Sequence, residues 1–198
     1  RKAFKTALPV LFNGNNYTQQ WHQEADARGL PHLRQSFHAF EMLREKKSVR
    51  VLQDVLSPEE IESRYEVLIE QYAKTLNVEA NLMLEILNTQ VLPAVQKDLQ
   101  RRFSCLQGAA ALSFASDEQK KGAERVSALL DEAIRAAGKI QLVQQQSTDF
   151  GWEAKARVFS ELMIPKMEQL RQAVDALELL VDDDVWPMPK YRELLFHV

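Results

Sequence analysis

Histidines and nearby carboxylates are the residues of this sequence that could hold a metal ion. The four histidines are His22, His32, His38 and His197. None of them lies in an H-E-x-x-H motif or in a Cys/His set with zinc spacing. Glu193 and His197 are four residues apart and could share a helical face, but we interpret His197 as an exposed histidine of the C-terminal segment. The Glu-x-x-His pairs that a di-iron site in a helical bundle requires do not occur.

Two groups of acidic residues could bind a divalent cation through their oxygens. Glu62, Glu66 and Glu70 form a row at four-residue spacing, which we interpret as a solvated helix face. Asp182, Asp183 and Asp184 are adjacent, and three such acids on one short loop rarely converge on an ion without ligands from elsewhere. Acids are unfavourable at a helix C-terminus, so we expect a helix to end just before residue 182.

Motifs for nucleophilic catalysis and for phosphate binding are absent from the sequence. Cys105 is the single cysteine, has no flanking histidine or acid pair, and is expected to be a buried small hydrophobic residue. The sequence contains no Walker A motif, no G-x-G-x-x-G and no G-x-S-x-G. Asn13-Gly14-Asn15-Asn16 is too short and too polar for a phosphate cradle. We therefore predict no catalytic, cofactor-binding or metal-binding residue in this chain.

Composition limits the class of protein. The chain has 198 residues, a formal net charge of −3, 45% hydrophobic and 27% charged residues, which is typical of a globular domain. The charge does not favour nucleic acid as a partner. No run of about 18 apolar residues predicts a membrane span, and no signal peptide is visible. One cysteine excludes an internal disulfide, so we expect a cytoplasmic protein.

Long helices must carry these residues. Residues 1–56 are expected to form a cap of short helices over 17–28, 36–47 and 48–56. Residues 7–12 are the one segment whose pattern would also allow a β-strand. At Ser57-Pro58-Glu59-Glu60 the sequence predicts a capping box, because serine can cap the first turn and Glu60 can return the hydrogen bond. An apolar stripe at three- and four-residue steps then continues through Leu99, Phe103 and Leu106.

Two more long helices are expected after a joint at residues 108–115. A second capping box at Ser116 predicts the start of one, and the other should cover about 150–181. Pro93 and Pro165 should each bend a helix. The predicted fold is all-α: an elongated antiparallel bundle of three long helices at 57–181, preceded by the cap. Residues 182–198 should form a docking tail, in which prolines stiffen a segment rich in Trp, Met, Tyr, Leu and Phe.

Three stretches resemble one family, the type III glutamine synthetases. The first is FNGNNYTQQWHQEADARGLPHL at residues 12–33. The second is ESRYEVLIEQYAKTLNVEANLMLEI at 62–86, which continues through QVLPAV at 90–95. The third is VWPMPKYRELLF at 185–196. Order and spacing agree with the family, whereas residues 104–150 carry no motif that we can match.

The resemblance implies the C-terminal helical region of such an enzyme. The family ligates ammonia to glutamate with ATP and divalent metal (Mg²⁺), using a β-grasp and β-barrel core upstream of this region. None of the core's motifs is present, so no catalytic residue can be assigned. The implied partners are that upstream core and further copies of the protein, because the family forms large assemblies.

Two alternatives remain open. The chain could be a stand-alone helical interaction module without catalysis. It could also be a regulatory bundle that binds a small ligand, which would require a polar-lined pocket between the helices.

Overall fold

The computed structural model describes residues 7–30 and 32–195. Within them the chain divides into two compact units, Arg1–Tyr65 and Glu66–Val198. The described residues form helices joined by turns and contain no strand, so the all-α prediction is confirmed. The possible strand at residues 7–12 is wrong, because Leu8–Val10 form the short 3-10 helix η1. No helix among the described residues has both the length and the apolar composition that a membrane crossing requires.

The first unit contains short helices. They are α2 (Gln19–Ala27), α3 (Ser36–Glu41), the 3-10 helix η2 (Met42–Arg44) and α4 (Lys46–Leu52). Phe37 of α3 is fully buried. The Arg44 guanidinium lies 4.6 Å from the centroid of the Tyr65 ring, and its Nε is 3.1 Å from the Glu62 carboxylate. The start of the long helix α5 (Pro58–Ile86) is therefore held within this unit by a cation–π contact and an ion pair.

The segment around Asn13-Gly14 has a structural role. The ring centroids of Phe12 and Trp21 are 4.6 Å apart, and Arg28 donates a 2.7 Å hydrogen bond to the Leu11 carbonyl while also pairing with Glu24. A Cβ atom on Gly14 would lie 2.6 Å from the Phe12 ring. Glycine at position 14 thus lets the chain pass close to the Phe12 ring of this tilted pair.

The predicted capping box at the start of α5 (Pro58–Ile86) is confirmed. The Ser57 hydroxyl accepts a hydrogen bond from the Glu60 N–H at 3.2 Å, and the Glu60 carboxylate accepts one from the Ser57 N–H at 2.7 Å. This reciprocal pair satisfies two donors that the helix itself leaves unpaired.

Three helical runs make up most of the chain from residue 58 onward. The first consists of α5, the π turn η3 (Leu87–Val91) and α6 (Leu92–Ala111). The second is α7 (Asp117–Gln146). The third consists of α8 (Trp152–Val158), the π turn η4 (Phe159–Met163) and α9 (Ile164–Glu178). Two of the expected long helices are therefore interrupted by a π turn.

Each π turn ends two residues before a proline. The Leu92 N–H bonds the Leu87 carbonyl ahead of Pro93, and the Ile164 N–H bonds the Phe159 carbonyl ahead of Pro165. A proline ring collides with the carbonyl four residues earlier in a regular α-helix. The wider π turn inserts one extra residue at that point and lets the helix continue past the proline.

The second predicted capping box is wrong. Ser116 is the N-cap of α7, but its side chain makes no capping hydrogen bond. Its backbone has φ −138° and ψ 27°, whereas a capping serine is extended and thereby directs its hydroxyl at the first turn.

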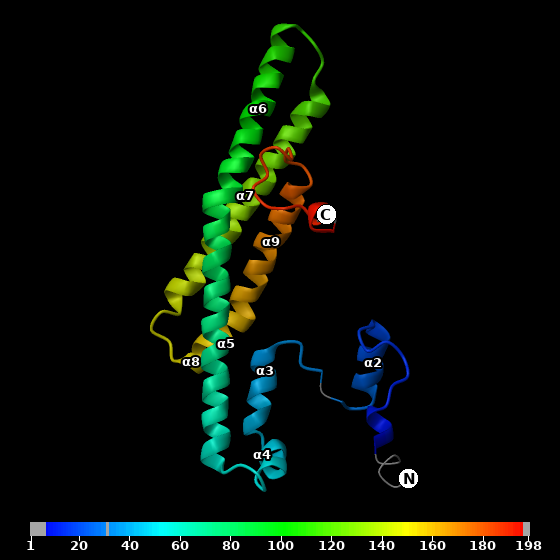
Figure 1. Cartoon of the computed structure of the whole chain (residues 1–198), viewed down its shortest axis with the longest axis vertical. Helices are drawn as coiled ribbons and strands as arrows, with labels where there is room; N and C mark the ends of the chain where they lie inside the picture. Colours follow the sequence, from blue (N-terminus) through cyan, green and yellow to red (C-terminus); the bar gives the residue numbers. More distant parts are fainter. Residues whose placement is uncertain (1–6, 31, 196–198) are drawn as a thin grey trace. The chain divides into compact units, whose positions relative to one another are not determined.

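Within the second unit, the chain turns back on itself twice. Figure 1 shows it rising through α6, returning along α7 and rising again through α9, and α9 lies alongside α7. The Gln144 amide of α7 donates to the side-chain oxygens of Asn77 at 3.1 Å and Asn81 at 2.8 Å on α5. The buried residues of these helices are mainly Val, Leu, Ile and Ala, so close apolar packing and the Gln144 hydrogen bonds help hold the runs together.

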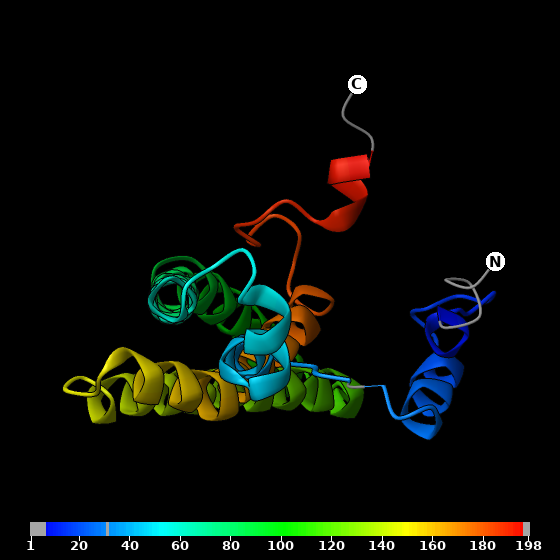
Figure 2. The same cartoon turned by 90° about the horizontal axis from the view of Figure 1, so that it is seen from below.

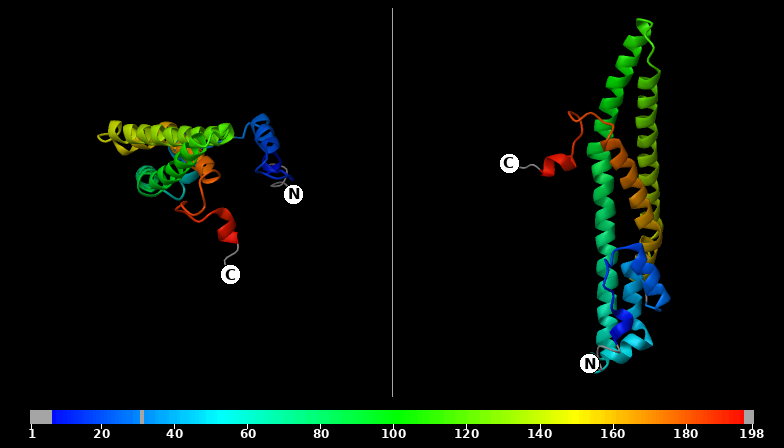
Figure 3. Two further views of the ribbon diagram at one scale, coloured as in Figure 1. Left: turned by 90° about the horizontal axis from the view of Figure 1, so that it is seen from above. Right: turned by 90° about the vertical axis from the view of Figure 1, so that its right-hand side faces the viewer.

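The last described helix is α10 (Tyr191–Leu195). Figures 2 and 3 show it standing apart from the helical runs. Leu194 and Leu195 are correspondingly exposed. The predicted burial of the tail does not extend to these two leucines, and Phe196 and His197 lie outside the described residues.

Candidate functional site

The glutamate row of α5 does not converge on one point. Glu62 pairs with Arg44 at 3.1 Å, and Glu70 pairs with Lys74 at 2.5 Å. Glu66 is exposed. Each carboxylate therefore faces its own cation or solvent, which is the arrangement of a charged helix surface.

The carboxylates of the three adjacent aspartates do not share one partner. Asp182 pairs with Arg101 at 2.7 Å, and Asp183 pairs with Lys190. The Asp184 N–H donates to the Asp182 carboxylate at 3.0 Å. As predicted, the preceding helix ends before these acids, at Glu178.

The histidines of the described residues are divided between separate contacts. His22 and His32 stack with ring centroids 4.1 Å apart and an interplanar angle of 7°, and His38 lies 3.0 Å from the Glu41 carboxylate. Nowhere in the described part of the chain do three or more His, Cys, Asp or Glu residues form a group that could hold a metal ion. These residues do not fit an Mg²⁺ or ATP–Mg²⁺ site, and we derive no chemical step through either group.

A buried ionic cluster around Asp98 was missed by the sequence analysis. Asp98 is only 3% exposed. Its carboxylate accepts from Arg102 Nε at 2.5 Å and from the Asp182 N–H at 3.4 Å. Arg102 also donates to the Leu180 carbonyl at 2.5 Å. The signal in the sequence was an acid on an apolar stripe, three residues after Val95.

These contacts place the end of α9 beside residues 98–102 of α6, so the α6–α7 hairpin continues beyond α9. Phe103, predicted to lie in the core stripe, is 49% exposed. It lies on a groove of about 450 Å³ between α6 and α7 that also includes Leu106 and Ala123. The prediction for Phe103 is wrong because α9 ends before it could cover this part of the hairpin. The expected burial of Cys105, two residues further along α6, is wrong as well, because Cys105 is exposed.

The segment between residues 181 and 190, which belongs to the second unit, makes contacts with α6 and α9. Trp186 is buried and Met188 is half-buried. Lys190 Nζ donates to the Glu178 carbonyl at 2.9 Å, which caps the C-terminal end of α9 with a positive charge. We name Asp98, Arg101, Arg102, Asp182, Asp183 and Lys190 the tail clasp, because their contacts fasten this segment to α6 and α9.

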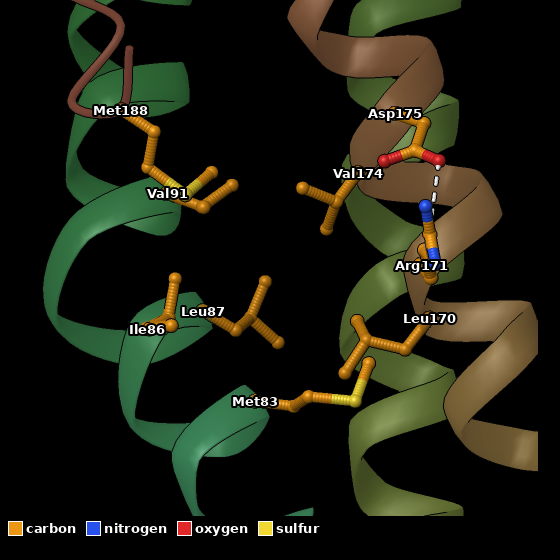
Figure 4. Close-up of a pocket in the computed structure, with 9 residues that line it drawn as sticks. All are labelled: Met83, Ile86, Leu87, Val91, Leu170, Arg171, Val174, Asp175 and Met188. Carbon is orange, nitrogen blue, oxygen red and sulfur yellow. Dashed lines mark hydrogen bonds and ion pairs between the residues drawn. The ribbon is translucent and has the colours of Figure 1, made fainter. Parts of the chain in front are cut away.

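An apolar cavity lies beneath the docked tail, between the first run and α9. It has a volume of about 160 Å³. Figure 4 shows Leu87 and Val91 facing Leu170 and Val174 across it, with Met83 and Met188 at its two ends. This cavity is apolar, unlike the polar-lined pocket expected of a regulatory bundle.

Comparison with known proteins agrees with the resemblance seen in the motifs. The chain is 32% identical over 197 residues to the type-3 glutamine synthetase of Dictyostelium discoideum, covering 94% of this chain and 27% of that protein. It is 26% identical over 201 residues to a glutamine synthetase of Bacteroides fragilis (strain YCH46), covering 95% and 27%. It is 30% identical over 202 residues to a glutamine synthetase of Butyrivibrio fibrisolvens, covering 94% and 27%.

The chain thus spans about a quarter of the length of the curated relatives that it matches. Residues 1–105, just over half of the chain, match the family described as the glutamine synthetase C-terminal domain. This chain belongs to the glutamine synthetase C-terminal domain family.

Proposed function

We propose that this chain is the structural and assembly region of a type III-like glutamine synthetase, whose whole polypeptide ligates ammonia to glutamate with ATP and Mg²⁺. The observation that carries the proposal is the family match together with the coverage of only 27% of each relative. On this account an upstream catalytic core holds the reacting groups. The three helical runs act as one antiparallel bundle in the cytoplasm and support that core and its copies.

The outward face of α5 supports an assembly role. Val67, Val78 and Leu82 lie on one side of the helix, opposite the buried stripe that contains Ala73 and Ala80, and all three are exposed. Three large aliphatic side chains along one helix face make a surface that another protein segment can cover. We assign this surface to contacts with the upstream core or with a further copy of the protein.

The proposal is tested by placing charge on that face in the full-length natural protein. Leu82→Glu should reduce the assembled mass measured by light scattering after size exclusion, because a buried unpaired carboxylate opposes association. Gln119→Glu is the matched control, since it adds the same charge at an exposed position of α7, away from this face. An unchanged assembly in Leu82→Glu would contradict the assembly role assigned to this face.

The alternative is a stand-alone helical interaction module, which the same exposed face would also suit. It predicts no glutamine formation by the natural gene product. A measurement of ATP-dependent glutamine formation by the full-length protein separates the two functions.

A further inference from the structure

The cavity beneath the tail has the size and lining of a ligand site. An engineered protein cavity of about 150 Å³ lined by aliphatic side chains stays dry and binds benzene or xenon. The cavity here has about 160 Å³ and is lined by aliphatic and thioether groups, but unlike that sealed cavity it is partly open to solvent. It can therefore hold one apolar group of about six carbon atoms.

Polar groups at the rim do not favour a water molecule or a charged ligand. Among the described residues that line the cavity, the charged ones are Arg171 and Asp175, one helical turn apart on α9. Arg171 Nε donates to the Asp175 carboxylate at 3.4 Å, and both side chains are exposed. A buried water needs two to four polar partners. The inner wall of Leu87, Val91, Leu170 and Val174 supplies no polar side-chain atom.

One wall of the cavity is formed by buried residues of a π turn, and its two ends are formed by methionines. Leu87 and Val91 are the first and last residues of the π turn η3, and both are buried. Met83 and Met188 lie at the two ends (Figure 4), and methionine can change rotamer at little cost because its side chain is unbranched. Met188 belongs to the docked tail, which the tail clasp holds through Lys190. An entering molecule could pass Met188 without disturbing the helices.

We propose that this cavity is a binding site for a small, uncharged, apolar molecule with about six carbon atoms, which enters past Met188. Neither assembly nor catalysis by a larger protein is needed for this binding. The proposed ligand binding and the proposed assembly function can therefore fail separately, because the binding test below is carried out on the chain itself.

The test is a benzene titration of the 198-residue chain labelled with ¹³C at its methionine methyl groups. The chain has five methionines. The Met83 and Met188 signals should shift and saturate, and that of Met42 in the first unit should not move. At ten times the Kd, the melting temperature should rise by about 3–6 °C. Absence of a saturable shift at Met83 and Met188 would overturn the proposal.

Two variants locate the site. Val174→Phe fills the cavity from α9 and should abolish the shifts at Met83 and Met188. The same substitution at Val51, which is exposed on α4 in the first unit, should leave them unchanged.

If Val174→Phe does not fold, Met188→Ala supplies an independent result. It enlarges the cavity and should change the preference for indole over benzene by about tenfold, since a few methylene-sized groups decide such a fit. An unchanged preference in Met188→Ala, or intact benzene shifts in folded Val174→Phe, would place the binding elsewhere.

Discussion

Replacing Asp98 with alanine tests the tail clasp, because its carboxylate is buried and accepts hydrogen bonds from Arg102 and from the Asp182 N–H. A hydrogen bond to a charged group contributes about 1.5–3 kcal/mol. The Arg102 side chain is 32% exposed and keeps its bond to the Leu180 carbonyl, so solvent limits the cost of its lost partner. We expect the free energy of unfolding to fall by about 2 kcal/mol, which corresponds to about 4–8 °C in melting temperature.

Chemical denaturation of the chain, followed by circular dichroism, measures this change. Asp175→Ala is the matched control, because Asp175 and Arg171 are also four residues apart but their side chains are 59% and 70% exposed. An exposed pair of this kind contributes about 0.3–0.5 kcal/mol. If the Asp98 and Asp175 variants lose equal stability, the buried cluster does not fasten the tail as described.

Three further predictions concern local structure. Ser57→Ala should lower the free energy of unfolding by about 1 kcal/mol because it breaks the capping box, whereas Ser116→Ala, which removes no capping bond, should change it by less than half as much in the same denaturation assay. Gly14→Ala should destabilise the first unit by about 1–3 kcal/mol, because the new methyl group displaces the Phe12 ring; unchanged near-ultraviolet dichroism and unchanged stability would contradict this. The backbone hydrogen bond of Glu59, and then the Ser57 hydroxyl, lower the pKa of the Glu59 carboxyl. Its contribution to stability should be present above the pKa of an unfolded glutamate and lost as the pH falls through the lower folded value. Glu59→Gln should remove this part of the acid-side decline, and identical pH–stability curves would refute it.

Local signals made the helix starts and ends predictable. The capping box at Ser57 and the end of α9 before the aspartates depend on residues within one turn of each other, so a single stretch of sequence contains the information. The prolines likewise indicated where the long helices would be disturbed. A helix can accommodate a proline by a kink or by a π turn, so the position of the proline alone does not specify which of the two forms.

Features built from distant segments could not be predicted in the same way. Asp98 meets residues more than eighty positions away, at the end of α9. The sequence shows that Asp98 lies on an apolar stripe, but it does not show that Asp182 is its distant partner. The cavity requires Met83, Val174 and Met188 to meet from three separate segments. The predicted burial of Phe103 was wrong for the same reason, because the exposure of its side chain depends on the point at which α9 ends.

The most direct test of the central claim is the coding sequence upstream of Arg1 in the natural gene. The account predicts a long in-frame extension that encodes glutamate-, ATP- and metal-binding motifs, with this chain as its C-terminal quarter. An in-frame stop codon followed by a start codon close to Arg1 would contradict the account and leave a stand-alone helical module.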